Sequence, residues 1–419
     1  MTPFSRKNPA NDSGHCLWSG QKPGANTDCL DTCPMLSHLS GSEVAGMHIR
    51  EFGVEQWMNR YETTCEWNLA ETCVESLTFG QLLDLAGKGN TVLDELLPMK
   101  LTYGEIEGSA RLRAAIASLY KGQGPANVTV THGAIGANAL VYQTLVERGD
   151  KVVSIVPTYQ QHYSIPESIG AEVRKLWLRP ENGFLPDLDE LRSLTAGGVK
   201  LIAVTNPNNP TGALIERPML EEIVKIARDA GAWLLGDEVY RGIDQEGDGF
   251  TISVADLYEK GISTGSMSKS YSLAGLRLGW IVAPQELIHK VSIHRDYNTI
   301  SVGMVDDYLA TLALRNRDKV LARSRNIVRG NLAVLSDWVD AEPLISWVKP
   351  KSGTIALLRY DVDMPSEELC IRLLEETGVM LTPGSALDME GWLRIGYANS
   401  PAVLAEGLAR MSEFLRRLA

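Results

Sequence analysis

The middle of the chain alternates short runs of apolar and β-branched residues with amphipathic helical patterns. The expected strands are 127–132, 151–157, 172–178, 200–206, 232–239 and 278–283. Helical patterns separate most of them, notably at 109–120, 137–149 and 219–231. Strands that are apolar along their whole length are buried on both faces, and helices between them act as crossovers. The alternation therefore predicts an α/β fold whose mainly parallel sheet is sandwiched by helices.

The last hundred residues have a different pattern, which predicts a smaller α+β domain. The expected elements are a long helical stretch over about 303–340, strands near 345–350 and 355–361, a helix over 366–378 and a strand over 392–398. We expect a large domain over 96–320 and a small domain made of 46–95 and 321–419. Residues 1–45 are rich in Gly, Ser, Asn, Pro and Asp, which predicts a disordered leader.

Composition excludes several classes of function. The net charge of −12 argues against a nucleic-acid or anionic-membrane partner, because both require clustered Lys and Arg. No apolar run is long enough to span a bilayer, and the N-terminal residues lack the apolar core of a secretory signal. We therefore expect a cytoplasmic protein whose six cysteines are free thiols. His15, Cys16, Cys29 and Cys33 match no standard zinc spacing, so no metal site is expected.

Three polar clusters follow expected strands. They are NPNNPTG at 206–212, DEVY at 237–240 and SMSKSYSLAGLRLGW at 266–280. In open α/β sheets, ligands bind at the carboxyl ends of the strands. The three clusters are therefore expected to share one site.

Asp237 and Lys269 are the residues on which the chemistry of this site depends. Asp237 follows the apolar run AWLLG, and a carboxylate buried there is costly unless it is paired with a cation. A protonated pyridine nitrogen is such a cation. Lys269 stands among small hydroxyl residues rather than on a charged face, and a lysine used for imine chemistry is expected to have a lowered pKa.

A phosphate site is expected beside this lysine. Ser266, Ser268 and Arg277 supply hydroxyl and guanidinium donors. Residues 133–135 (Gly133, Ala134 and Ile135) open a helix directly after a strand, where backbone N–H groups bind anions.

These motifs resemble those of the aminotransferase class I/II family of fold-type I pyridoxal-phosphate enzymes, from about residue 50 to the end. The resemblance implies an aspartate-aminotransferase-like fold and pyridoxal 5′-phosphate held as a Schiff base on Lys269. It implies chemistry at the α-carbon of an L-amino acid. It also implies a homodimer whose subunits share their active sites.

The resemblance further implies a role for each matching residue. Asp237 corresponds to the partner of the pyridine nitrogen, and Tyr240 and Asn209 to the contacts of the ring hydroxyl. Tyr159 corresponds to the aromatic residue stacked on the ring, and Tyr103 to a tyrosine that reaches the neighbouring subunit's phosphate.

The same resemblance identifies candidate substrate contacts. Arg394 corresponds to the arginine that binds the substrate α-carboxylate as a bidentate pair. Asn209 and Ala70 are further substrate-binding candidates.

The motifs leave the reaction open. Transamination is the commonest activity of the family, whereas expulsion of a group from Cβ would make the protein a lyase, such as a carbon–sulfur lyase. Segments 178–191 and 295–301 are similar to parts of capreomycidine synthase-like enzymes of specialised metabolism, which eliminate at Cβ and then close a ring. Oxidation is a rarer outcome. A DNA-binding regulator built on this fold is disfavoured, because the leader is not basic and has no helix-turn-helix pattern.

The side-chain pocket is not defined by these motifs. Its candidate segments are 68–74, 241–249 and 295–301. Glu71, Asp244 and Glu246 in the first two would favour a cationic substrate, although a solvated loop equally explains the last two.

Overall fold

The computed structural model describes residues 48–89 and 91–418. The predicted disordered leader, residues 1–45, lies outside the described residues, as do His15, Cys16, Cys29 and Cys33.

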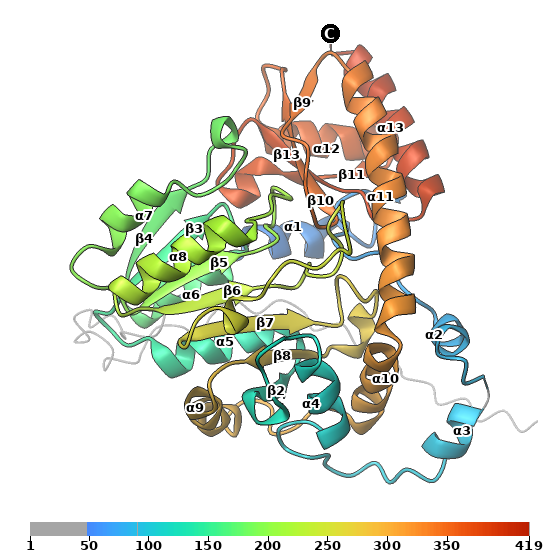
Figure 1. The fold of residues 1–419 in the computed structure, drawn as a ribbon. Coiled ribbons are helices and arrows are strands. Elements are labelled where there is room, and N and C mark those ends of the chain that lie inside the picture. The colour runs from blue at the N-terminus through green and yellow to red at the C-terminus, as the bar shows by residue number, and fades with distance from the viewer. Residues whose placement is uncertain (1–47, 90, 419) are drawn as a thin grey trace, which may run out of the picture. The chain divides into compact units, whose positions relative to one another are not determined.

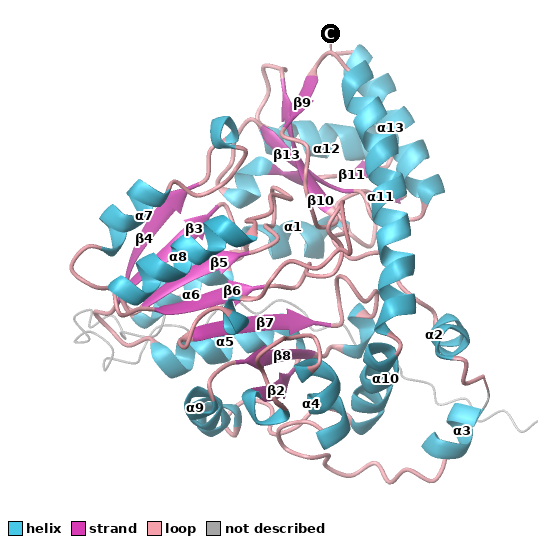
Figure 2. Cartoon of the chain, in the orientation of Figure 1, coloured by secondary structure: helices cyan, strands magenta, loops and turns pink. Residues whose placement is uncertain are grey.

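A seven-stranded sheet forms the centre of the fold, in the order β2-β8-β7-β6-β5-β3-β4 (Figures 1 and 2). Its strands are β2 (Val128–Thr131), β3 (Lys151–Val156), β4 (Glu172–Trp177), β5 (Leu201–Thr205), β6 (Trp233–Asp237), β7 (Gly261–Ser266) and β8 (Gly279–Val282). All pairings from β4 to β7 are parallel, and β8 runs antiparallel to both β7 and β2. The predicted mainly parallel α/β sheet is confirmed.

Helices cover both faces of this sheet. Strand β5 alternates its side chains between them, because successive residues of a strand point to opposite sides. Leu201 and Ala203 pack with α5 (Gly133–Leu145), α6 (Gln161–Ile169) and α9 (Gln285–Arg295). Ile202 and Val204 pack with α7 (Leu188–Thr195) and α8 (Arg217–Asp229). Burial of both faces explains why the strand is apolar throughout.

Strand β7 was not among the expected strands. Its sequence, GISTGS, has too few apolar residues to signal a strand, yet all its residues are buried. Residue 265 of β7 must be small because it pairs with Trp280 of β8, whose ring packs across it. A Cβ on Gly265 would lie 2.6 Å from the Trp280 ring.

A second, four-stranded antiparallel sheet lies in the C-terminal part, in the order β12-β13-β10-β9. Its strands are β9 (Ile345–Trp347), β10 (Ile355–Tyr360), β12 (Thr382–Pro383) and β13 (Trp392–Gly396), with helices α12 (Ser366–Thr377) and α13 (Pro401–Arg416). Strand β1 (Trp67–Asn68) pairs with β11 (Val379–Met380), which joins the N-terminal segment to this part. The α+β character is as expected, while the exact domain boundaries stay a prediction.

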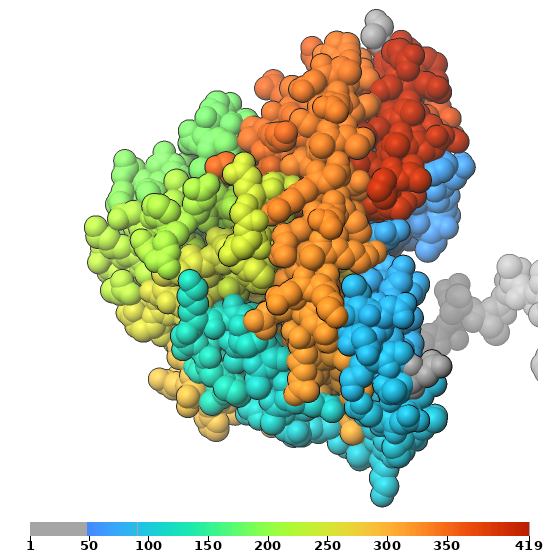
Figure 3. Space-filling view, turned by 45° about the vertical axis from the view of Figure 1, so that its right-hand side comes forward, coloured from blue at the N-terminus to red at the C-terminus, as the bar shows by residue number. Residues whose placement is uncertain are grey.

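The helical stretch expected over about 303–340 is present, but as two helices. The structure has α10 (Met304–Arg315) and α11 (Arg317–Ala341), interrupted at Asn316. The Asn316 side chain donates to the Leu312 carbonyl at 2.9 Å, and such local bonds compete with helical geometry. Figure 3 shows this segment (orange) at the surface, beside the red C-terminal helix and the blue N-terminal segment.

The remaining helices are α1 (Gly53–Tyr61), α2 (Phe79–Ala86), α3 (Thr91–Leu96) and α4 (Ala110–Ala117). Within residues 48–89 and 91–418, none of the helices has the length and apolarity needed to cross a membrane.

Two glycine-to-alanine substitutions test the close packing between the C-terminal sheet and the N-terminal segment. The Gly396 N–H donates to the Leu69 carbonyl at 2.7 Å, and a Cβ there would overlap the backbone oxygen of Glu71. Gly396→Ala should therefore lower the free energy of unfolding by about 1–3 kcal/mol. Gly330 is exposed inside α11 with open space around it, so Gly330→Ala should raise that free energy by about 0.5–1 kcal/mol. Thermal unfolding measures both; an equal response of the two variants would contradict the packing.

Candidate active site

A cavity of about 330 Å³ lies at the carboxyl ends of the central strands. All the sequence-predicted site residues except Tyr103 line it, namely Ala70, Gly133, Ala134, Ile135, Tyr159, Asn209, Asp237, Tyr240, Ser266, Ser268, Lys269, Arg277 and Arg394. We call it the site cavity. It brings together residues more than three hundred positions apart in the sequence.

Tyr103 lies elsewhere. Its side chain is 76% exposed and lines a separate hollow with Arg111 and Met304. Within one chain, Tyr103 therefore does not take part in the site cavity.

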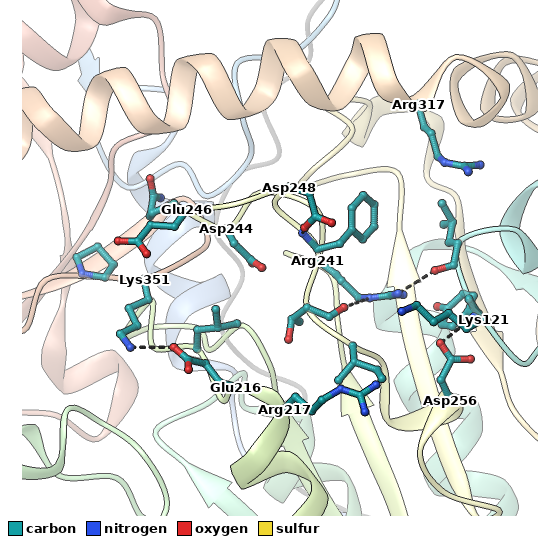
Figure 4. A pocket seen from close by; sticks show the side chains of 18 of the residues that line it. Lys121, Glu216, Arg217, Arg241, Asp244, Glu246, Asp248, Asp256, Arg317 and Lys351 are labelled. Carbon is teal, nitrogen blue, oxygen red and sulfur yellow. Dashed lines mark hydrogen bonds and ion pairs between the residues drawn. The ribbon is translucent and has the colours of Figure 1, made fainter.

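Another cavity, of about 920 Å³, does not contain the predicted catalytic residues. It is lined by Asp244 and Glu246 together with basic residues such as Arg241 and Lys351 (Figure 4). Of the three acidic residues considered for the substrate pocket, only Glu71 lines the site cavity. No residue of segment 295–301 lines the site cavity either.

Asp237 ends β6 and is 4% exposed. Its Oδ2 accepts a hydrogen bond from Asn138 at 2.9 Å and lies 3.1 Å from Nε2 of the buried His162. His162 in turn lies 2.9 Å from the Tyr142 hydroxyl through Nδ1. Oδ1 accepts only a long bond, 3.4 Å, from the Val239 N–H. Because Oδ2 of Asp237 is held by two neighbours, the other carboxylate oxygen, Oδ1, is the one directed toward the cavity.

Sequence reasoning missed Asn138 and His162. Asn138 lies on the second turn of α5 and His162 follows Tyr159 by three residues, so both lie close to predicted site residues. Only the tertiary structure places both against Asp237, because α5 and α6 pack side by side on one face of the sheet.

Lys269 is held by the segment before α2. Its Nζ donates to Thr72 Oγ1 at 2.6 Å and lies 3.5 Å from Cys73 Sγ. Burial lowers the pKa of Lys269, but neighbouring Cys73, Tyr240 and Glu71 raise it more, so the net shift is upward. Burial raises the pKa of the Cys73 thiol itself to about 11, so Glu71 is the neighbour that carries charge near pH 7. This upward direction differs from the lowered lysine pKa expected from the sequence.

The segment carrying these residues is shaped by local side-chain caps. Asn68 Oδ1 accepts the N–H groups of Ala70 and Glu71 at 2.9 and 3.0 Å. Glu71 Oε1 accepts those of Thr72 and Cys73, both at 2.7 Å. Carboxylate and amide caps of this kind fix a turn without regular secondary structure. Nothing in the sequence pattern indicated Thr72 or Cys73 as neighbours of Lys269.

Arg394 on β13 is a buried cation. It is 2% exposed, and its guanidinium donates to Thr382 Oγ1 at 3.1 Å and, over longer distances, to Asn209 Oδ1 and the Ala70 carbonyl. Its Nε has no partner, and no carboxylate of the described residues lies within 4.0 Å of it. Burial lowers the pKa of Arg394, but a guanidinium remains charged at neutral pH. A buried charge without a counter-charge fits an anionic ligand.

Two tyrosines line the site cavity, and their hydroxyl groups differ in hydrogen bonding. The Tyr240 hydroxyl is buried without a hydrogen-bond partner among the described residues. The Tyr159 hydroxyl donates to Glu55 of α1 at 2.8 Å, and burial followed by the charge of Glu55 raises its pKa. Tyr240 is therefore free to bind a ligand through its hydroxyl, whereas Tyr159 offers its ring.

An anion cradle lies at the start of α5. Gly133 has φ +67°, and a Cβ there would lie 3.2 Å from an Arg277 nitrogen. A Cβ on Gly279 would overlap the backbone of Gly133, so the close approach requires glycine at that position. Arg277 forms no ion pair within the described ranges. Its guanidinium donates to the Ala274 carbonyl at 3.1 Å. Helix-start N–H groups beside a guanidinium without a counter-charge are suited to a phosphate.

Comparisons with known proteins show which proteins the chain resembles. The family model described as "Aminotransferase class I and II" matches residues 94–411. The chain is 33% identical to capreomycidine synthase of Streptomyces vinaceus over 366 residues, which is 86% of this chain and 93% of that protein. It is 28% identical to an aspartate aminotransferase of Thermotoga maritima, over 75% of this chain and 84% of that protein.

A solved structure is also similar. The PLP-dependent aminotransferase from Streptococcus suis 89-1591 has a TM-score of 0.86 and 42% identity, covering 88% of this chain and 99% of that one.

The unbalanced charge of Arg394 can be tested through stability. Arg394→Met should raise the free energy of unfolding by about 1–3 kcal/mol, because it removes a buried charge that has no counter-charge. Arg359→Met changes an exposed arginine on the adjacent strand β10 and serves as the control, with no expected change. Denaturant titration of both variants gives the result. A less stable Arg394→Met protein would mean that the bonds to Thr382 and Asn209 outweigh the cost of burying the charge.

Proposed function

The chain belongs to the aminotransferase class I and II family, and on that basis we propose that it binds pyridoxal 5′-phosphate on Lys269 and transfers the amino group of an L-amino acid. One observation carries the proposal: Lys269, Asp237 and the unpaired Arg394 face the same cavity. Each supplies one thing the chemistry needs, namely an amine, a buried carboxylate and a carboxylate-binding cation.

The residues present fit this cofactor. Asp237 is the partner for a protonated ring nitrogen, and the unpartnered hydroxyl of Tyr240, with Asn209, is placed to bind the ring hydroxyl. Tyr159 offers its ring as a stacking surface.

The phosphate group fits the cradle at the start of α5. The backbone of Gly133, Ala134 and Ile135 would bind it together with Arg277. Ser266 and Ser268 line the cavity as further hydroxyl donors. When bound, pyridoxal phosphate supplies an electron sink for the charge that develops at the α-carbon.

The protein's own residues carry the remaining steps. Arg394 binds the substrate α-carboxylate and so orients the α-carbon toward Lys269. Lys269 Nζ moves the proton at that carbon, as a general base and then as an acid. Thr72 and Glu71 hold the amine, Thr72 through the 2.6 Å bond and Glu71 through its charge.

A second candidate is elimination at Cβ, followed in some relatives by ring closure. The 33% identity to capreomycidine synthase over most of both chains favours it. The Thr72 hydroxyl beside Lys269 is a polar group that a leaving group on Cβ could contact. Both candidates use the same base and the same cofactor, so they differ only after the α-proton has been removed.

We also propose that two copies assemble, with Tyr103 reaching the partner's phosphate site. Supporting this, Leu97, Leu101 and Tyr103 are 80%, 85% and 76% exposed, which is unusual for such large apolar groups close together in sequence. We likewise propose a large domain over 96–320, a small domain made of 46–95 and 321–419, and a cytoplasmic location.

The cofactor assignment predicts a visible chromophore. The purified protein should absorb in the visible range, and Lys269→Ala should abolish the band. Lys290→Ala, at an exposed position on α9, should retain it. Reduction with borohydride and peptide mass analysis should place the cofactor adduct on Lys269. An adduct on a different lysine would refute the assignment.

The two reactions differ in their need for an amino acceptor. A transaminase needs a 2-oxo acid acceptor for turnover and releases no excess ammonia. An eliminating enzyme releases ammonia and a 2-oxo acid continuously without an acceptor, or a cyclic product if the ring closes. An amino-acid panel assayed with and without 2-oxoglutarate therefore decides between them. Sustained turnover without an acceptor would overturn amino transfer as the main activity.

A further inference from the structure

One wall of the site cavity carries three glutamates. Glu55, Met58 and Glu62 lie three and four residues apart along α1 and its C-cap, so they share one face of the helix, and all three line the cavity. Glu71 lines the cavity from the segment after β1. We call the carboxylates of Glu55, Glu62 and Glu71 the glutamate wall.

No member of the glutamate wall forms an ion pair within the described part of the chain; the nearby positive charge is that of Lys269, which acts on both Glu62 and Glu71. Glu55 accepts the Tyr159 hydroxyl, and Glu71 accepts two backbone N–H groups. Glu62 has no side-chain hydrogen bond to any described residue, so its carboxylate is fully available. Burial, and then the charges of Glu71 and Glu55, raise the pKa of Glu62, which indicates that Glu71 and Glu55 repel the Glu62 carboxylate.

An independent observation points to a ligand in the same cavity. The buried Arg394 has an unpartnered Nε, and the buried Tyr240 has an unpartnered hydroxyl. An α-carboxylate at Arg394 and a cofactor ring beside Asp237 would occupy two sides of the cavity. The glutamate wall is then the side left for the substrate side chain.

We propose that the substrate is an amino acid whose side chain ends in a cation, a guanidinium or an ammonium group, and that Glu62, with Glu55 and Glu71, binds it. This rests on the function proposed above. A cationic group relieves the repulsion that Glu71 and Glu55 exert on Glu62, whereas a side-chain carboxylate would add to it. The chain therefore differs in substrate from relatives that are named for aspartate.

The test compares ligands of similar shape and different charge on the cofactor-loaded enzyme. L-Arginine, L-lysine and L-ornithine are titrated against L-citrulline, a neutral near-isostere of arginine, and against L-aspartate, following the change in the visible band. At least one cationic ligand should bind about tenfold or more tightly than citrulline, and aspartate should bind more weakly still. The preference should shrink as salt is added, because Glu62 is exposed to solvent.

Matched charge variants locate the effect. Glu62→Gln should weaken binding of the cationic ligand about tenfold and leave citrulline unchanged. Glu51→Gln removes the same charge from an exposed residue just before α1 that does not line the cavity, and it should change neither.

The outcomes separate the two proposals. If citrulline or aspartate binds as well as every cationic ligand, or if Glu62→Gln alters nothing, the cationic-substrate proposal is overturned while the cofactor assignment stands. If the protein has no visible band, or no amino acid changes it, the proposed function itself fails.

Discussion

The site depends first on a buried carboxylate held by its neighbours. Asp237 ends β6, and Asn138 and His162 hold one of its oxygens from two helices on the same face of the sheet. Asn138 also accepts the Thr264 hydroxyl of β7 at 2.8 Å, so the network ties two strands to α5 and α6. An unpaired charge at this depth would destabilise the fold, and the hydrogen bonds from these neighbours compensate only in part. What they leave is a fixed, directed carboxylate that suits a cationic ring nitrogen.

The second constraint is the contact between the C-terminal sheet and the segment after β1. The Leu69 carbonyl accepts the Gly396 N–H, and the Thr72 carbonyl accepts the Thr354 hydroxyl at 2.6 Å. These bonds hold the segment whose Thr72 side chain contacts Lys269. The candidate binding site thus exists only because two distant parts of the chain close over the edge of the central sheet. Its unpaired charges cost stability, as expected where residues are arranged for a ligand rather than for the fold.

The comparisons explain why the shared machinery does not identify the reaction. An enzyme named as a synthase and enzymes named as aminotransferases resemble this chain over most of its length. The predicted cofactor residues come from strand ends, which these proteins have in common as part of the fold. The glutamate wall instead comes from α1 and from the capped segment that follows β1. Differences in substrate are expected in such peripheral segments, since they can change without disturbing the sheet.

The sequence by itself determined the sheet and its cofactor motifs, because apolar alternation and short motifs depend on residues close together along the chain. It did not indicate β7, whose small residues are dictated by Trp280 packing across them, or the helix break at Asn316. Nor could it assign His162 to Asp237, or the direction in which Glu71 shifts the pKa of Lys269. Only the tertiary structure decided these, because burial and electrostatic coupling arise between segments that folding brings together.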